Sequence, residues 1–279
     1  MKSLEETLPS HTINQDLITD SGFVIKLATE VAPSPENKDM GCLVVGGFMS
    51  TQDTNIPFRS AFVEESGIDT TTMSFSEIGL ENILQTDQVR IEDVEAAIRE
   101  ISKTKNEIIV IAHSMGASIV ADTILKLNSE LLSKVKVFVM VNGAGLIKKD
   151  GIDEVAPRVY RAYKERKEEG KGYGKTVKGK ATLLGMAGRL VRLAADGINA
   201  ARNKSLSEIG VIKAKGICVI NIVSQYDHVF PDDLVDESTA NLPIDIRASI
   251  IGGSHSTPSD QPQELAKTIA NMIGIHTQH

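Results

Sequence analysis

The chain has 279 residues, of which 41% are hydrophobic and 24% are charged, and its formal net charge at pH 7 is −7. This composition is typical of a folded globular protein, and the length suffices for one large domain with an insertion. Because the whole molecule is acidic, its charge gives no reason to expect nucleic acid or an anionic membrane as a partner.

The first 20 residues are polar and carry acidic side chains early, at Glu5 and Glu6. They have no basic start followed by the apolar run of a signal peptide, and the longest apolar runs of the chain have the length of strands. We therefore expect a cytoplasmic protein. Cys42 and Cys218 lie inside two different apolar runs, which predicts two buried, reduced thiols.

Apolar runs and helical patterns alternate along the chain. The predicted strands are Gly22–Thr29 (half of an edge hairpin), Gly41–Gly47, Thr70–Phe75, Glu107–Ala112, Val135–Val141, Ile217–Val223 and Ile246–Ile251. The predicted helices are Ile91–Ile101, Met115–Leu127 and Pro262–Ile273. This alternation predicts an α/β fold with a mainly parallel sheet that has helices on both faces.

A basic segment interrupts this alternation before Ile217–Val223. Residues 148–204 contain 15 Lys and Arg against 7 Asp and Glu, whereas the rest of the chain is acidic. We expect residues 148–208 to form a helical, basic cap or lid, inserted into a core of residues 1–147 and 209–279. A solvated lysine-rich surface is the alternative reading of the same composition.

The sequence Ile-Ala-His-Ser-Met-Gly-Ala at 111–117 lies where a predicted strand meets a predicted helix. A nucleophilic serine on such a sharp turn requires small residues two positions before and after it, and Ala112 and Gly116 meet this requirement. The pattern predicts Ser114 as nucleophile and the Met115 amide as an oxyanion-hole donor. The alternative is a serine that only caps the helix. We expect His113 to pack around the turn, with a role as the base as its alternative.

These residues resemble the nucleophile elbow of the α/β-hydrolase family, in which nucleophile, acid and histidine follow in that order. After Ile217–Val223 comes Ser-Gln-Tyr-Asp-His-Val-Phe-Pro, which is similar to the acid turn of the family and implies Asp227 as the acid. Gly-Gly-Ser-His-Ser at 252–256 is similar to its histidine turn and implies His255 as the base. A turn-forming aspartate and a solvated histidine are the alternatives. Some relatives carry the acid one strand earlier, near Asn142, which cannot ionise.

Gly46-Gly47-Phe48 resembles the His-Gly-x turn of the family, which implies the Phe48 amide as the second oxyanion donor. The chain has Gly46 where many relatives have histidine. A tight turn that needs glycines is the alternative.

The chain contains no motif for a metal or a cofactor, and we expect none to be required. The resemblance implies a serine hydrolase that cleaves a carboxylic ester or thioester of a small or acyl-chain substrate. An acyltransferase, a cofactor-free haloperoxidase and a catalytically silent binding protein stay open as alternatives. We expect a small-molecule partner and no nucleic acid, with membrane contact through the basic cap as a secondary alternative. The sequence does not indicate an oligomeric state.

Overall fold

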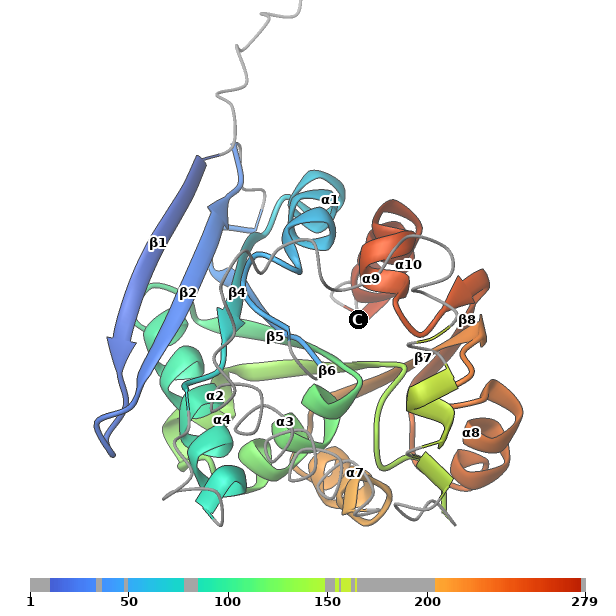
Figure 1. The fold of residues 1–279 in the computed structure, drawn as a ribbon. Helices are drawn as coiled ribbons and strands as arrows, with labels where there is room; N and C mark the ends of the chain where they lie inside the picture. The colour runs from blue at the N-terminus through green and yellow to red at the C-terminus, as the bar shows by residue number, and fades with distance from the viewer. Residues whose placement is uncertain are drawn as a thin grey trace, which may run out of the picture.

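An eight-stranded sheet organises the part of the chain that the computed structural model describes (Figure 1). The described residues are 11–33, 37–47, 50–77, 85–148, 154–155, 157–161, 164 and 204–276. The strands are β1 (His11–Ile18), β2 (Val24–Val31), β3 (Met40–Val45), β4 (Asp69–Ser74), β5 (Glu107–His113), β6 (Val135–Val141), β7 (Cys218–Tyr226) and β8 (Ile246–Ser254).

The order of strands in the sheet is β1-β2-β4-β3-β5-β6-β7-β8. β1 and β2 form an antiparallel hairpin, β2 joins β4 antiparallel, and all later pairs are parallel. Val45 of β3 pairs with Ala112 of β5, and His113 pairs with Val141 of β6, so these strands end at one edge of the sheet. The predicted α/β fold with a mainly parallel sheet is confirmed.

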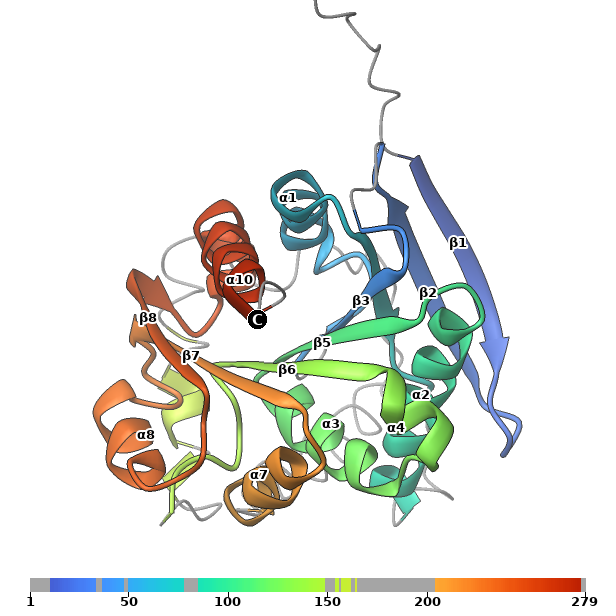
Figure 2. The same ribbon diagram turned by 180° about the vertical axis from the view of Figure 1, so that it is seen from behind.

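Helices cover both faces of the sheet. They are α1 (Ile56–Ser66), α2 (Thr86–Ser102), α3 (Met115–Lys126), α4 (Ser129–Lys134), α7 (Lys204–Ala214), α8 (Asp232–Thr239), α9 (Thr257–Asp260) and α10 (Pro262–His276). In Figure 1 and in the reverse view of Figure 2, α1 and α10 lie on one face, whereas α2, α3 and α7 lie on the other.

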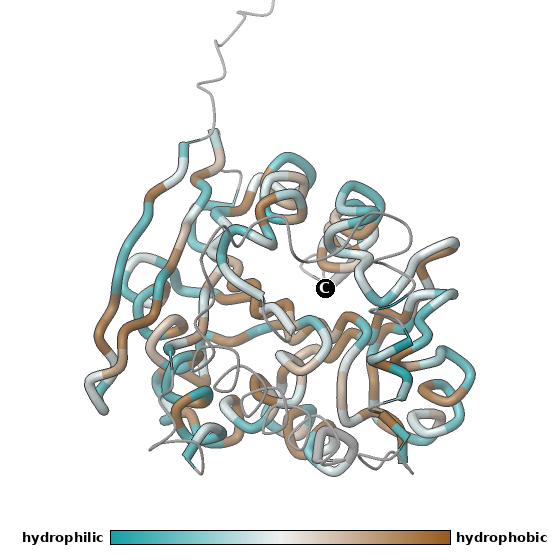
Figure 3. The backbone as a smooth tube through the Cα atoms, viewed as in Figure 1, coloured by the Kyte–Doolittle hydropathy of each residue, from teal (hydrophilic) through white to brown (hydrophobic). Residues whose placement is uncertain are grey.

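Two apolar cores result, one on each face of the sheet. Along β5, Ile109 and Ile111 face the core under α1 and α10, while Ile108 and Val110 face the core under α2 and α3. This alternation explains why the strand reads as a continuous apolar run: a strand buried on both faces has no polar side. The central strands are accordingly largely brown in Figure 3.

The predicted elements correspond to observed ones, with small shifts of their ends. The predicted helix at Ile91–Ile101 is the centre of α2, and Val135–Val141 is β6. Helix α1 was not predicted, nor was strand β1. Most of the predicted cap at 148–208 lies outside the described residues, so the domain division stays a prediction; α7 extends across its boundary between 208 and 209. Within the described ranges, no helix is long and apolar enough to cross a membrane.

Candidate active site

The turn from β5 into α3 holds Ser114 in a strained backbone conformation. Its φ is 55° and its ψ is −126°, a region that residues other than glycine rarely adopt. A Cβ on Gly116 would lie 2.7 Å from the carbonyl oxygen of Gly46 and 2.8 Å from that of Val45. Because both atoms belong to backbone, the turn tolerates no side chain there. Ser114 makes no side-chain capping bond to α3, so its hydroxyl does not serve as the helix cap.

Three predicted residues meet at the carboxyl edge of the sheet, each just after a different strand. Ser114 follows β5, Asp227 follows β7 and His255 follows β8. His255 Nε2 lies 2.9 Å from Ser114 Oγ, and His255 Nδ1 lies 2.8 Å from Asp227 Oδ2. The three side chains therefore form a continuous hydrogen-bonded chain from a hydroxyl to a carboxylate. A proton on His255 Nδ1 leaves Nε2 free to accept the proton of the serine hydroxyl.

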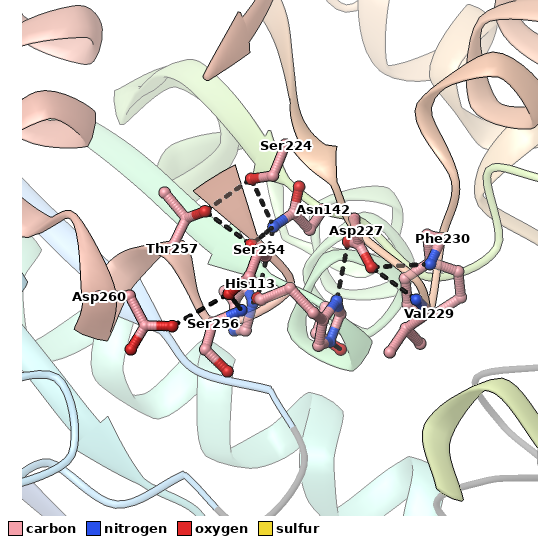
Figure 4. A network of polar contacts seen from close by, with 12 residues as sticks. His113, Asn142, Ser224, Asp227, Val229, Phe230, Ser254, Ser256, Thr257 and Asp260 are labelled. Atoms are coloured by element: carbon pink, nitrogen blue, oxygen red, sulfur yellow. Dashed lines mark hydrogen bonds and ion pairs between the residues drawn. The ribbon is translucent and has the colours of Figure 1, made fainter. Parts of the chain in front are cut away.

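The carboxylate of Asp227 is fully buried, and both of its oxygens have partners. Oδ1 accepts hydrogen bonds from the amides of Val229 (2.7 Å) and Phe230 (2.9 Å), while Oδ2 faces His255. The ring of Phe230 also lies 5.5 Å from that of His255. The turn-forming role of Asp227 and its contact with the imidazole are thus two uses of one side chain, and the turn fixes the carboxylate towards the ring (Figure 4).

Two side chains that sequence reasoning left outside the site contact the backbone of the histidine loop. His113 contacts the carbonyl oxygen of His255, and so does Asn142, which follows β6 (Figure 4). Burial, with a smaller contribution from the neighbouring His255, lowers the pKa of His113 to about 3. His113 is therefore neutral near pH 7 and packs beneath the site. The only signal in the sequence was that each residue directly follows or ends a buried strand.

Of the two predicted oxyanion donors, Met115 lies within the described residues and Phe48 does not. Met115 is buried and is the first residue of α3, where unpaired amides and the helix dipole favour negative charge. Phe48 lies outside the described residues, so its role stays a prediction. Its neighbour Gly47 lies against the serine: a Cβ on Gly47 would be 2.7 Å from Ser114 Cβ and 3.2 Å from Ser114 Oγ. Within the described ranges, no group of three His, Cys, Asp or Glu side chains could hold a metal ion.

No family model and no curated protein matches this sequence. Many solved structures match the fold, and the following three do so at low sequence identity. An esterase of Pyrococcus furiosus superposes with a TM-score of 0.64 at 13% identity, over 95% of this chain and 91% of its own. A thioesterase domain from the curacin biosynthetic pathway gives 0.63 at 12% identity, over 93% and 99%. An epoxide hydrolase of Vigna radiata gives 0.60 at 13% identity, over 94% and 98%. The strand order, the strained turn after β5 and these similarities establish that the chain has the α/β-hydrolase fold.

Proposed function

We propose that the chain is a serine hydrolase that cleaves a carboxylic ester or thioester of a small or acyl-chain substrate. One observation carries this proposal: the unbroken hydrogen-bonded chain of Ser114 Oγ, the His255 imidazole and the Asp227 carboxylate, which starts on a strained turn. A serine held in this way is the activated nucleophile of acyl transfer.

In the first step, Ser114 Oγ attacks the carbonyl carbon of the substrate while His255 Nε2 takes the hydroxyl proton. Asp227 stabilises the imidazolium that forms, because its carboxylate already faces Nδ1. The negative charge on the tetrahedral oxygen lies at the N-terminus of α3, near the Met115 amide. The Phe48 amide is the proposed second donor.

In the second step, His255 returns the proton to the departing alkoxide or thiolate, which leaves Ser114 acylated. Water then attacks the acyl carbon, and His255 accepts a proton from it as it did from the serine. The tetrahedral intermediate then breaks at its bond to Ser114 Oγ, and His255 returns the proton to that oxygen. The carboxylic acid leaves, and the serine hydroxyl is restored. Both half-reactions use the same three side chains, and in both the transferred proton is held on His255 Nε2.

An ester or thioester is the proposed substrate class because its leaving group needs less help from a general acid than an amine does. The esterase and thioesterase among the similar structures support this class. The epoxide hydrolase has the same fold, so the fold alone does not set the reaction. The serine and its partners, rather than the fold, therefore support acyl transfer.

The test is to treat the protein with a fluorophosphonate, map the adduct and measure turnover of p-nitrophenyl acetate and octanoate. We expect one adduct, on Ser114, and loss of both labelling and turnover in Ser114→Ala. Ser118→Ala is the matched control, because Ser118 is a buried serine on α3, four residues after Ser114, and its hydroxyl donates to the Met115 carbonyl oxygen. Folded protein that neither reacts with the probe nor turns over either ester overturns the proposal.

The role of the acid is tested separately. Asp227→Asn keeps the shape of the side chain but favours the wrong tautomer of His255, so kcat should fall about 10³- to 10⁴-fold. Circular dichroism and thermal unfolding show whether the variant stays folded. Unchanged kcat in folded Asp227→Asn contradicts the role given to this carboxylate.

A further inference from the structure

Asn142 lies directly after β6, between the turns that carry Ser114 and His255. Its side chain is buried, and its backbone has a φ of 48°, in the left-handed region. Its Nδ2 lies 3.0 Å from Ser224 Oγ, 3.1 Å from the Ser254 carbonyl oxygen and 3.3 Å from the His255 carbonyl oxygen. The amide group therefore faces the backbone of the loop that carries the histidine.

The surroundings of Asn142 select a hydrogen-bond donor. Two of the three atoms within reach are carbonyl oxygens, which can only accept, so a reversed amide would place oxygen against oxygen. In the observed orientation, Oδ1 is buried and has no hydrogen-bond partner among the described residues. A buried acceptor without a partner costs free energy. The hydrogen bonds that Asn142 Nδ2 donates offset this cost.

His113 reaches the same carbonyl oxygen from β5. Its Nε2 lies 2.7 Å from the His255 oxygen. Because the imidazole is neutral and a carbonyl oxygen only accepts, its proton must be on Nε2. On its other side, a Cβ on Gly47 would lie 3.3 Å from His113 Nδ1, so the ring fills the space between the oxyanion turn and the histidine loop.

We propose that Asn142 and His113 are positioning residues. From the ends of two strands they donate hydrogen bonds to the carbonyl oxygens of Ser254 and His255, and so orient His255 Nε2 towards Ser114 Oγ. This inference rests on the proposed function, in which that 2.9 Å contact carries the proton. The bond to Asp227 fixes one point of the imidazole, and the hold on the backbone fixes the other end of the side chain. A displacement of about 1 Å in such a site can cost about 100-fold in rate.

Asn142→Asp is the first variant to test. Aspartate has the same shape and tolerates a positive φ, but its carboxylate cannot donate to the two carbonyl oxygens. We expect kcat to fall about 10- to 100-fold with KM nearly unchanged, since only the transition state depends on this alignment. Asn221→Asp is the matched control: Asn221 is equally buried on β7, and in the described part of the chain its Oδ1 also has no hydrogen-bond partner. It should keep its kcat wherever it folds.

His113 supplies an independent pair of variants. Glutamine can place a donor nitrogen near the position of Nε2, whereas leucine cannot. We expect His113→Leu to lower kcat about as strongly as Asn142→Asp, and His113→Gln to recover most of that loss. Equal losses in the two variants, or equal losses in Asn142→Asp and Asn221→Asp, mean that these residues act only through stability and overturn the proposal.

A spectroscopic readout separates this inference from the proposed function. The Nδ1 proton of His255, in its bond to Asp227, should give a downfield proton resonance in the wild-type protein. We expect this resonance to shift or broaden in Asn142→Asp and His113→Leu but not in Asn221→Asp. If the wild type shows no ester turnover, the proposed function fails while this measurement still tests the positioning. An unchanged resonance in folded Asn142→Asp and His113→Leu overturns the positioning whatever the activity.

Discussion

At the scale of single residues, two glycines allow the main chain to pack closely around Ser114. Gly116 faces two carbonyl oxygens of the preceding turn, and Gly47 faces the serine side chain itself. The absence of a Cβ at each position lets two chain segments approach closely enough to place a hydroxyl beside an amide-bearing turn. The two glycines therefore have different consequences: Gly116 is required for the fold of the turn, and Gly47 for the position of the nucleophile.

Gly47→Ala should impair reaction more than folding. The added methyl group would lie 2.7 Å from Ser114 Cβ, so the serine or the turn must shift. We expect the rate of fluorophosphonate labelling to fall about 100-fold, as for other misplacements of about 1 Å. Gly210→Ala is the control, because Gly210 is exposed on α7 and a Cβ there would meet no atom of the described residues within 4 Å. It should leave labelling unchanged and raise the free energy of unfolding by about 0.5–1 kcal/mol. Labelling of Gly47→Ala at the wild-type rate contradicts this role of Gly47.

The sequence predicts those site residues that lie in turns of a characteristic composition. Ser114, Asp227 and His255 each follow a buried strand in a turn with a characteristic composition, so the predicted strands alone bring them to one edge of the sheet. Asn142 carried no such signal, because two of its three side-chain contacts are to main-chain atoms of a loop more than a hundred residues away. Backbone acceptors are present at every position, and their placement depends on the register of β6 against β7 and of β7 against β8.

At the scale of elements, the loop after β3 is fastened to β4. The Gln52 amide donates to Ser74 Oγ at 2.8 Å, and Ser74 Oγ donates in turn to Gln52 Oε1. Thr72 Oγ1 also lies 3.1 Å from the Gln52 carbonyl oxygen. These contacts hold the far end of the loop that begins at Gly46 and that carries the proposed second oxyanion donor.

Ser74→Ala removes both contacts between Ser74 and Gln52. We expect kcat for p-nitrophenyl acetate to fall roughly tenfold, less than the loss of an oxyanion donor itself. The free energy of unfolding should fall by about 1 kcal/mol, as for one or two hydrogen bonds. Ser133→Ala is the control, since Ser133 is exposed and its hydroxyl donates to the Glu130 carbonyl oxygen within α4. An equal change in kcat for the two variants would falsify the anchoring role.

The junction of β4 and α2 contains a buried carboxylate. Asp93 accepts hydrogen bonds from the amide (2.9 Å) and hydroxyl (2.6 Å) of Ser76, yet burial raises its pKa to about 6. Between about pH 4, the ordinary value, and pH 6, the folded protein holds this proton and the unfolded chain releases it. Raising the pH through this window should therefore lower stability, by at most about 3 kcal/mol from this group.

Asp93→Asn should remove that part of the pH dependence. The amide oxygen can accept from the Ser76 amide while its nitrogen donates to the Ser76 hydroxyl, so the geometry is retained. Urea unfolding of both proteins from pH 4 to 8 gives the difference in free energy of unfolding. We expect the free energy of unfolding of the variant to rise relative to that of the wild type as the pH rises to about 6. Above about pH 7, the difference between the two free energies should stay constant. A difference that is flat from pH 4 to 6 contradicts the raised pKa.

The sequence pattern did not predict β1 and α1, and the physical reason differs between the two elements. Nearly all residues of β1 are exposed, because it pairs only with β2 at the edge of the sheet, so it has no buried face to produce an apolar alternation. Helix α1 buries Arg59 among its apolar residues, so its buried face does not read as an apolar stripe. In both cases the tertiary partner, and not the local pattern, determines the element.

At the scale of the whole molecule, that arginine joins the N-terminal hairpin to the parallel sheet. Arg59 Nε lies 3.2 Å from Glu30 Oε2 of β2, with only 4% and 8% of the two side chains exposed. Arg59 Nη1 donates to the Ala28 carbonyl oxygen (3.2 Å) and to Thr72 Oγ1 of β4 (3.1 Å). One guanidinium thus connects α1, β2 and β4, and through Thr72 it supports the loop at Gln52.

A double-mutant cycle tests whether this buried pair is a single unit. Glu30→Leu leaves a buried guanidinium without its carboxylate, and Arg59→Met leaves a buried carboxylate without its guanidinium. Each single change should lower the free energy of unfolding by about 3–5 kcal/mol, because the remaining charge stays out of water. The double variant should lose less than the sum of the two, by about 1–3 kcal/mol, since neither charge is then buried. Urea unfolding measures all four proteins, and an unchanged m-value shows that the hairpin still unfolds together with the sheet. Strictly additive losses would mean that the two charges do not stabilise each other, and the connection between hairpin and sheet would then depend on main-chain pairing alone.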